Sequence, residues 1–133
     1  MRVMFDTNIL ISSIIFGNSR LAELTRRIAD EFNLVLSSQI IEELQLVVGI
    51  KFPNKKESLN KFMSKLSFEM AYTPSEINPE IYPKIRDKKD YPVLASAIIA
   101  DVDVFITGDK DFSVLEIDRP EIMTISEFAE KYF

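Results

Sequence analysis

Short apolar runs alternate with amphipathic segments along this 133-residue chain, and the alternation restricts its fold more than any other feature. Apolar runs of three to five residues are typical of buried strands, and apolar residues repeated every three or four positions are typical of helices. Five runs are expected to form strands, at residues 3–5, 34–36, 68–72, 104–107 and 122–125. Short buried strands separated by helices favour a parallel sheet covered on both faces. We therefore expect a single α/β domain over residues 1–133, with a central parallel sheet of about four to five strands.

The segments between these runs carry the capping and turn residues that helices need. Ser19 is expected to open a helix through Phe32, and Ser37 and Ser38 to open the next one. Asp90, followed by Pro92, is expected to cap a helix over residues 93–100, which is apolar nearly all round and should be buried.

The absence of two residue types limits the chemistry. The chain contains no histidine and no cysteine, which excludes zinc fingers, Ser-His-Asp and Cys-His catalytic sites, and disulfide scaffolds. It has only three glycines, far apart, so neither a P-loop nor a dinucleotide-binding glycine turn can be built. Catalysis by such a chain depends on carboxylates, hydroxyls, amides, lysine, arginine, tyrosine or a hard cation held by oxygen ligands.

Acidic residues follow the predicted strands, at the edge where open parallel sheets bind ligands. They are Asp6 after the first strand, Glu43 in the helix after the second, Asp90 before the buried helix, and Asp109 and Asp111 after the fourth strand. Like charges that converge in a partly desolvated cleft need neutralisation, and Lys110 is the one base closely interleaved with them. This pattern favours Mg²⁺ or Mn²⁺. Taken singly, each acid also has a structural interpretation as a helix cap, a turn residue or a solvated helix residue.

Four segments together resemble the motifs of PIN domains, in the order that the family has them. They are residues 3–10 (Val-Met-Phe-Asp-Thr-Asn-Ile-Leu), 37–44 (Ser-Ser-Gln-Ile-Ile-Glu-Glu-Leu), 86–97 (from Arg86 through Asp90 to Ala97) and 106–112 (Ile-Thr-Gly-Asp-Lys-Asp-Phe). The resemblance implies a metal-dependent ribonuclease. It also implies that the compact chain is a VapC-type toxin that a small antitoxin protein holds inactive.

Carried over to this sequence, the resemblance implies a catalytic set of Asp6, Glu43, Asp90 and Asp109, which together with Asp111 would hold Mg²⁺ or Mn²⁺. Thr7, Asn8 and Thr107 are candidates for orienting these carboxylates by hydrogen bonds. Three alternatives stay open: Glu42 in place of Glu43, Asp87 in place of Asp90, and Asp111 in place of Asp109.

The expected partners are an RNA substrate, a small antitoxin and a second copy of the chain, because residues 9–16 form an apolar helix that we expect to be exposed. No segment is typical of a signal peptide or long enough to span a membrane, so we expect a cytoplasmic protein that does not contact membranes. Two other functions remain: a PIN-like module that binds protein or RNA without catalysis, and a metal-dependent phosphatase. The haloacid-dehalogenase type of phosphatase needs a second acid two residues after Asp6, where this chain has Asn8.

A net charge of −5 is unfavourable for binding nucleic acid. Setting aside the five candidate site acids, however, leaves as many acidic as basic residues (21 less 5, against 16). The acidic excess is then a property of the site, and we expect the remaining surface to bind RNA weakly and without long-range attraction.

Overall fold

The central feature of the computed structural model, which describes all residues from Met1 to Phe133, is a five-stranded parallel sheet in the order β3-β2-β1-β4-β5. The strands are β1 (Arg2–Phe5), β2 (Asn33–Ser37), β3 (Glu69–Ala71), β4 (Val104–Ile106) and β5 (Glu121–Met123). The expected α/β fold with a parallel sheet is confirmed, and all five predicted strands are present.

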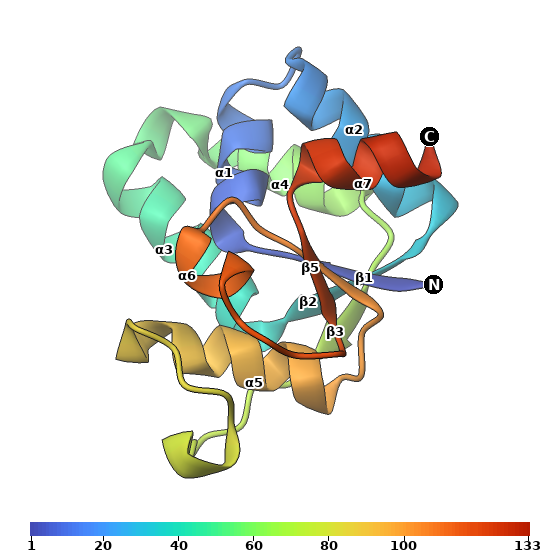
Figure 1. Ribbon diagram of the computed structural model, residues 1–133. Coiled ribbons are helices and arrows are strands. Elements are labelled where there is room, and N and C mark those ends of the chain that lie inside the picture. The colour runs from blue at the N-terminus through green and yellow to red at the C-terminus, as the bar shows by residue number, and fades with distance from the viewer.

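Helices cover both faces of this sheet. The α-helices are α1 (Thr7–Ile15), α2 (Arg20–Glu31), α3 (Ser38–Lys51), α4 (Lys56–Lys65), α5 (Tyr91–Ile99), α6 (Lys110–Ser113) and α7 (Ile125–Tyr132). Three single-turn 3₁₀ helices are η1 (Pro53–Lys55), η2 (Pro79–Ile81) and η3 (Lys88–Asp90). In Figure 1, α5 lies on one side of the sheet, and α2 and α7 lie together on the other. No helix combines the length and the apolar character that a membrane crossing requires.

The strand order places β1 at the centre of the sheet, between β2 and β4. The chain first builds outward through β2 and β3, and then returns through α5 to add β4 and β5 on the other side of β1. Ligands of open parallel sheets bind outside the carboxyl ends of the strands, at the point where the direction of building reverses. In this fold that point lies between the ends of β1 and β4.

The core explains why these short strands are stable. Residues 3–5 of β1 and 104–106 of β4 are almost fully buried, as expected for a sheet covered on both faces. Behind β4, Phe105 packs against Phe112 of α6 with 5.1 Å between the ring centroids. Since Phe112 is itself buried, this contact anchors the short α6 to the sheet. The fully buried core thereby fixes the segment that carries Asp109 and Asp111.

Two local expectations were wrong. The last strand ends at Met123, and α7 begins at Ile125, because Thr124 caps that helix in a reciprocal capping box with Glu127. The apolar segment 9–16 is also less exposed than expected, since Ile9, Leu10 and Ile14 are buried within the chain. Phe16 is the residue of that segment with a largely exposed side chain.

Candidate functional site

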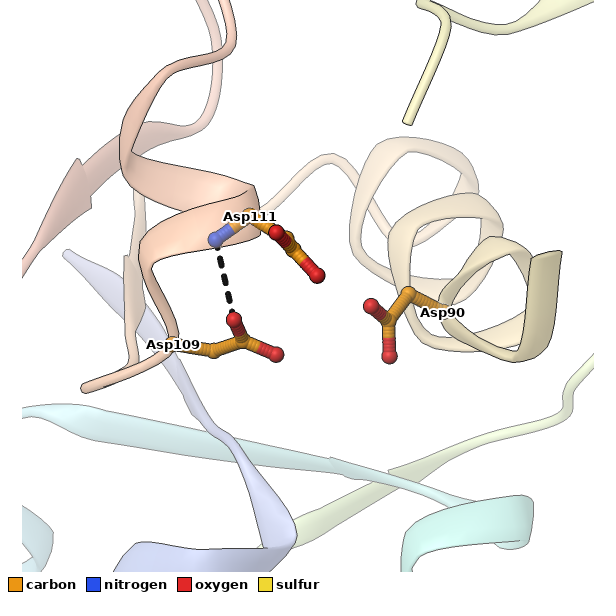
Figure 2. Close-up of side chains that lie close together, drawn as sticks. All are labelled: Asp90, Asp109 and Asp111. Carbon is orange, nitrogen blue, oxygen red and sulfur yellow. Dashed lines mark hydrogen bonds between the residues drawn. The ribbon is translucent and has the colours of Figure 1, made fainter. Parts of the chain in front are cut away.

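The acids that follow the strands do meet at the carboxyl edge of the sheet. Asp90, Asp109 and Asp111 each present a carboxylate oxygen within 4.8 Å of the others. Figure 2 shows these three side chains pointing toward one another, Asp90 from the start of α5 and the other two from α6 and the turn before it. The three residues are half-buried. The strongest concentration of negative charge at this edge therefore comes from the C-terminal half of the chain.

Asp6 joins this group from the end of β1. Its carboxylate accepts hydrogen bonds from the backbone N–H of Thr7 at 2.7 Å and from the hydroxyl of Thr107 at 2.8 Å. Burial raises the pKa of Asp6, the two hydrogen bonds lower it, and the nearby charge of Asp109 raises it, with a net rise. Asp6 is thus both the N-terminal cap of α1 and a partly desolvated carboxylate beside the acidic group.

Thr107 connects Asp6, which follows β1, to Asp109, which follows β4. Its buried hydroxyl donates to Oδ2 of Asp6 and accepts from the backbone N–H of Asp109 at 3.0 Å. The backbone N–H of Thr107 donates to the carbonyl of Met123 in β5 at 3.0 Å. One hydroxyl therefore positions the acid that follows β1 and the acid that follows β4, and the sheet holds that hydroxyl in place. Thr107, a candidate from the sequence for orienting the carboxylates, thus contacts two of the candidate site acids.

Glu43 and Glu42 point to different surroundings. Oε2 of Glu43 accepts a hydrogen bond from the hydroxyl of Thr7 at 3.0 Å, which brings it next to Asp6. Glu42 lines a separate depression, which Ser38, Thr73 and Pro92 also border. Of the two glutamates, Glu43 is the one that is hydrogen-bonded to Thr7, the residue directly after Asp6.

Asn8 lies at the same edge, with its side chain exposed. Together with Asp6, Ile9, Gly108 and Asp109 it lines a depression of about 360 Å³ on the side of α1. Asn8 makes no side-chain hydrogen bond to a carboxylate, so it differs from Thr7 and Thr107, which both do.

Asp109 forms the turn from β4 into α6. Oδ1 of its side chain accepts the backbone N–H of Asp111 at 2.9 Å, shown by the dashed line in Figure 2, so Asp109 caps α6. Its second carboxylate oxygen is left for other partners. Both Asp109 and Asp111 belong to the acidic group.

Asp90 differs from the expectation that it caps the helix over residues 93–100. It stands at the start of α5, but its side chain makes no capping hydrogen bond, because its backbone is already helical at the end of η3. Asp87 is the residue that caps, accepting the N–H of Lys89 at 3.0 Å. The carboxylate of Asp90 is directed at Asp109 and Asp111 instead (Figure 2).

The surroundings of Asp90 raise its pKa strongly. Desolvation is the main cause, followed by the negative charges of Asp109 and Asp87 and then those of Asp6 and Asp111. Together they raise the pKa of Asp90 to about 6. Asp90 is thus a partly desolvated carboxylate whose charge is also opposed by neighbouring acids.

Sequence reasoning missed one residue of the site, Arg86. Its Nε and Nη2 donate to the two carboxylate oxygens of Asp111, each at 2.9 Å. This guanidinium lowers the pKa of Asp111. Lys110, which we expected to be the one interleaved base, is exposed and forms no ion pair. The sequence signal for Arg86 was its place at the start of the third motif, but nothing there assigned it a partner.

The donor set at this edge fits a small hard cation. Four aspartates and one glutamate supply oxygen ligands only, which suits Mg²⁺ and Mn²⁺ and gives no site for a soft metal. Arg86 is the one basic side chain that forms an ion pair with these acids, so their negative charges outnumber the positive charge beside them. The residues present therefore fit the metal that the motifs imply.

Comparison with known proteins gives a consistent result. A fold similar to that of this chain occurs in the crystal structure of VapBC2 from Rickettsia felis bound to a DNA fragment from their promoter, with a TM-score of 0.68, 20% identity, and 92% of this chain and 97% of that chain covered. The PIN domain of human SMG5 is also similar, with a TM-score of 0.55, 11% identity and both chains covered completely. A search of curated proteins found no match. The PIN domain family model matches residues 2–111, which is most of the sequence, and the chain therefore belongs to the PIN domain family.

Proposed function

We propose that this chain is a metal-dependent endoribonuclease that hydrolyses phosphodiester bonds of RNA. The observation that carries the proposal is the convergence of Asp90, Asp109 and Asp111, with carboxylate oxygens within 4.8 Å of one another, beside Asp6. Members of the PIN family are generally nucleases, which supports the same reaction class. We further propose that residues 1–133 act as one nuclease domain.

In this proposal Asp6, Asp90 and Asp109 hold Mg²⁺ or Mn²⁺, with Glu43 and Asp111 as additional oxygen ligands. A bound Mg²⁺ or Mn²⁺ would lower the pKa of a water molecule and stabilise negative charge on phosphoryl oxygens. Thr107 fixes the position of the Asp6 carboxylate relative to the backbone of Asp109, and Thr7 orients Glu43. Asn8 is exposed at the rim, and in this proposal it donates a hydrogen bond to the substrate. No imidazole is needed as a general base, which is compatible with a chain that contains no histidine.

Metal removal tests this proposal directly. We expect EDTA to abolish the cleavage of a mixed set of RNA substrates and Mn²⁺ or Mg²⁺ to restore it, because the carboxylates alone repel a phosphodiester. End-group analysis of the products should find 5′-phosphate and 3′-hydroxyl termini, and single-stranded DNA of the same sequences is the control for substrate class. Cleavage that persists in EDTA would contradict the proposal. RNA binding without cleavage at any metal concentration would favour the binding module, and release of phosphate from small phosphate esters would favour the phosphatase.

The neighbouring glutamates provide a matched pair of variants. We expect Glu43→Gln to lower the cleavage rate about tenfold to a hundredfold, as is usual when a group that supports a metal site is lost. Glutamine can still accept the hydrogen bond of Thr7, so the loss would report the missing charge. Glu42→Gln removes the same charge one residue earlier and should change the rate less than about twofold, as for exposed substitutions away from a site. Initial rates at saturating Mn²⁺ give the comparison, and equal rates for the two variants would refute the role of Glu43.

We also propose that the chain is the toxin of a toxin–antitoxin pair with a small antitoxin protein as partner. The similarity in fold to a chain of the VapBC2 complex supports this. A homodimer and a cytoplasmic location remain predictions. Since Ile9, Leu10 and Ile14 are buried, a dimer would have to use other apolar side chains, such as Phe16, Leu46 and Ile50, which are more than 60% exposed.

A further inference from the structure

One of the acids proposed to bind the metal already has a cationic partner within the chain. Both carboxylate oxygens of Asp111 accept hydrogen bonds from the guanidinium of Arg86, at 2.9 Å each. This is the two-pronged geometry in which arginine binds carboxylates most strongly. Asp90 and Asp109, the other two members of the group, have no such ion pair.

In this ion pair the rest of the chain holds Asp111 more firmly than Arg86. The side chain of Arg86 is 78% exposed and that of Asp111 only 18%. Asp111 is fixed in α6, because its backbone N–H donates to Asp109 and its neighbour Phe112 is buried against Phe105. Arg86 lies in the irregular segment between η2 and η3, and its side chain donates no other hydrogen bond. If the pair opens, Arg86 is therefore the partner that leaves, and Asp111 stays within reach of Asp90 and Asp109.

From this geometry we infer that Arg86 competes with the divalent metal for Asp111, so that metal binding at full strength requires Arg86 to be displaced. The inference rests on the proposed function of the site. The oxygens of Asp111 that face the guanidinium are the ones that a metal would use, and a guanidinium and a divalent cation repel each other at the same carboxylate. The ion pair thus weakens metal binding and also stabilises the acidic group while no metal is bound.

A different role for Arg86 makes the opposite prediction. If Arg86 held Asp111 in the correct orientation for the metal, its removal would weaken metal binding. If the pair were only a surface ion pair far from the metal, its removal would act only through the loss of one positive charge. The loss of one positive charge near the acidic group is controlled by Lys110→Gln. Lys110 lies between Asp109 and Asp111 in sequence, is exposed, and forms no ion pair.

The test is a calorimetric titration with Mn²⁺ of the wild-type chain, Arg86→Gln, Lys110→Gln, Asp111→Asn and the double variant Arg86→Gln/Asp111→Asn. We expect Arg86→Gln to bind Mn²⁺ about threefold to tenfold more tightly than wild type, the range expected when a two-pronged but exposed competitor is removed. Lys110→Gln should bind less than about twofold more tightly. When Asp111 is already asparagine, there is no carboxylate left for Arg86 to compete for. The double variant should therefore exceed Asp111→Asn in affinity for Mn²⁺ by no more than Lys110→Gln exceeds wild type. Thermal unfolding without metal checks that each variant is folded.

The outcomes separate the inference from the proposed function. Affinity of Arg86→Gln that is equal to that of Lys110→Gln, or lower than that of wild type, would overturn the inference and leave the metal site intact. The same holds for a full effect of Arg86→Gln in the Asp111→Asn background. Failure of every folded variant to bind Mn²⁺ would overturn the proposed function together with the inference.

Discussion

Replacing Asp6 with asparagine is expected to lower the rate of RNA cleavage about a hundredfold to a thousandfold, the scale of losing one charge-stabilising group from an active site. Asp6 directly follows the central strand β1. It accepts a hydrogen bond from the N–H of Thr7, whose hydroxyl donates to Glu43. It also accepts one from the hydroxyl of Thr107, which in turn accepts from the N–H of Asp109. Loss of its negative charge would remove one of the proposed metal ligands. The rate is measured with excess Mn²⁺, so that weaker metal binding and slower chemistry can be separated by titration.

The fold is expected to tolerate this substitution. Asparagine caps a helix about as well as aspartate, so the hydrogen bond from the N–H of Thr7 persists. The amide of asparagine can donate to the hydroxyl of Thr107, which has lone pairs for both that amide and the N–H of Asp109. The unfolding temperature should therefore change by no more than a few degrees, corresponding to less than about 1 kcal/mol.

Asp118→Asn is the matched control, because Asp118 is exposed and outside the acidic group. It should cleave RNA at the wild-type rate. Expression in bacterial cells provides a second readout: the wild-type chain should slow growth when its antitoxin is absent, and Asp6→Asn should not. Wild-type cleavage by Asp6→Asn would contradict the proposed site, since no other residue at this edge can replace a carboxylate at the end of β1.

The second large effect is expected at Asp90, where activity and stability should change in opposite directions. Asp90→Asn should lower the cleavage rate by about two orders of magnitude and, in the absence of metal at pH 7, stabilise the folded chain. The pKa of Asp90 is raised from its ordinary value of 3.8 to about 6. A rise of that size corresponds to about 3 kcal/mol for a fully buried group, and because Asp90 is only partly buried, solvent screening reduces the expected gain to about 1 kcal/mol.

The pH dependence of this stabilisation has a definite sign. Above pH 6 the folded and the unfolded chain both carry a charged Asp90, and the folded chain bears the full cost of desolvating that charge and of its repulsion by the other acids. As the pH falls from 6 toward 3.8, the folded chain takes up the proton first, so this cost disappears from the free energy of unfolding. The advantage of Asp90→Asn over wild type should therefore be largest at pH 7 and vanish near pH 4. Denaturant unfolding at several pH values in EDTA measures it.

Asp87→Asn is the control for this experiment. It makes the same chemical change three residues earlier, and asparagine can keep the capping hydrogen bond to Lys89. We expect cleavage close to wild type and at most a small gain in stability, because desolvation and Asp109 both raise the pKa of Asp90 more than Asp87 does. A variant at Asp87 as inactive as Asp90→Asn would assign the third acid of the site to Asp87.

The order of strands and helices could be predicted from the sequence because burial on both faces leaves a simple pattern. Residues 3–5, 34–36 and 104–106 are apolar without interruption, and all three runs are strands in the sheet. Ser19 and Ser37 cap α2 and α3 as expected, since a hydroxyl before an apolar repeat is a local signal. The boundary between β5 and α7 was harder to predict, because Ile125 suits a strand as well as the first turn of a helix.

The acids at the strand ends could also be predicted, because the carboxyl ends of parallel strands must meet at one edge. What the sequence could not supply was the direction of single side chains. Asp90 looked like a helix cap and is not one, because a 3₁₀ turn capped by Asp87 precedes it. Arg86 is paired with an acid 25 residues further along the chain, from an irregular segment without periodicity. Contacts of that kind depend on the path of a loop, which local patterns do not determine.

The position of β1 between β2 and β4 has a consequence for how the protein is made. The hydrogen bond that links Thr107 to Asp6 joins residues 101 positions apart, and β4 can pair with β1 only after the segment between them has been made. A growing chain on the ribosome carries Asp6 and Glu43 well before Asp90, Asp109 and Asp111 are added. The proposed nuclease site would thus stay incomplete until synthesis has passed Asp111.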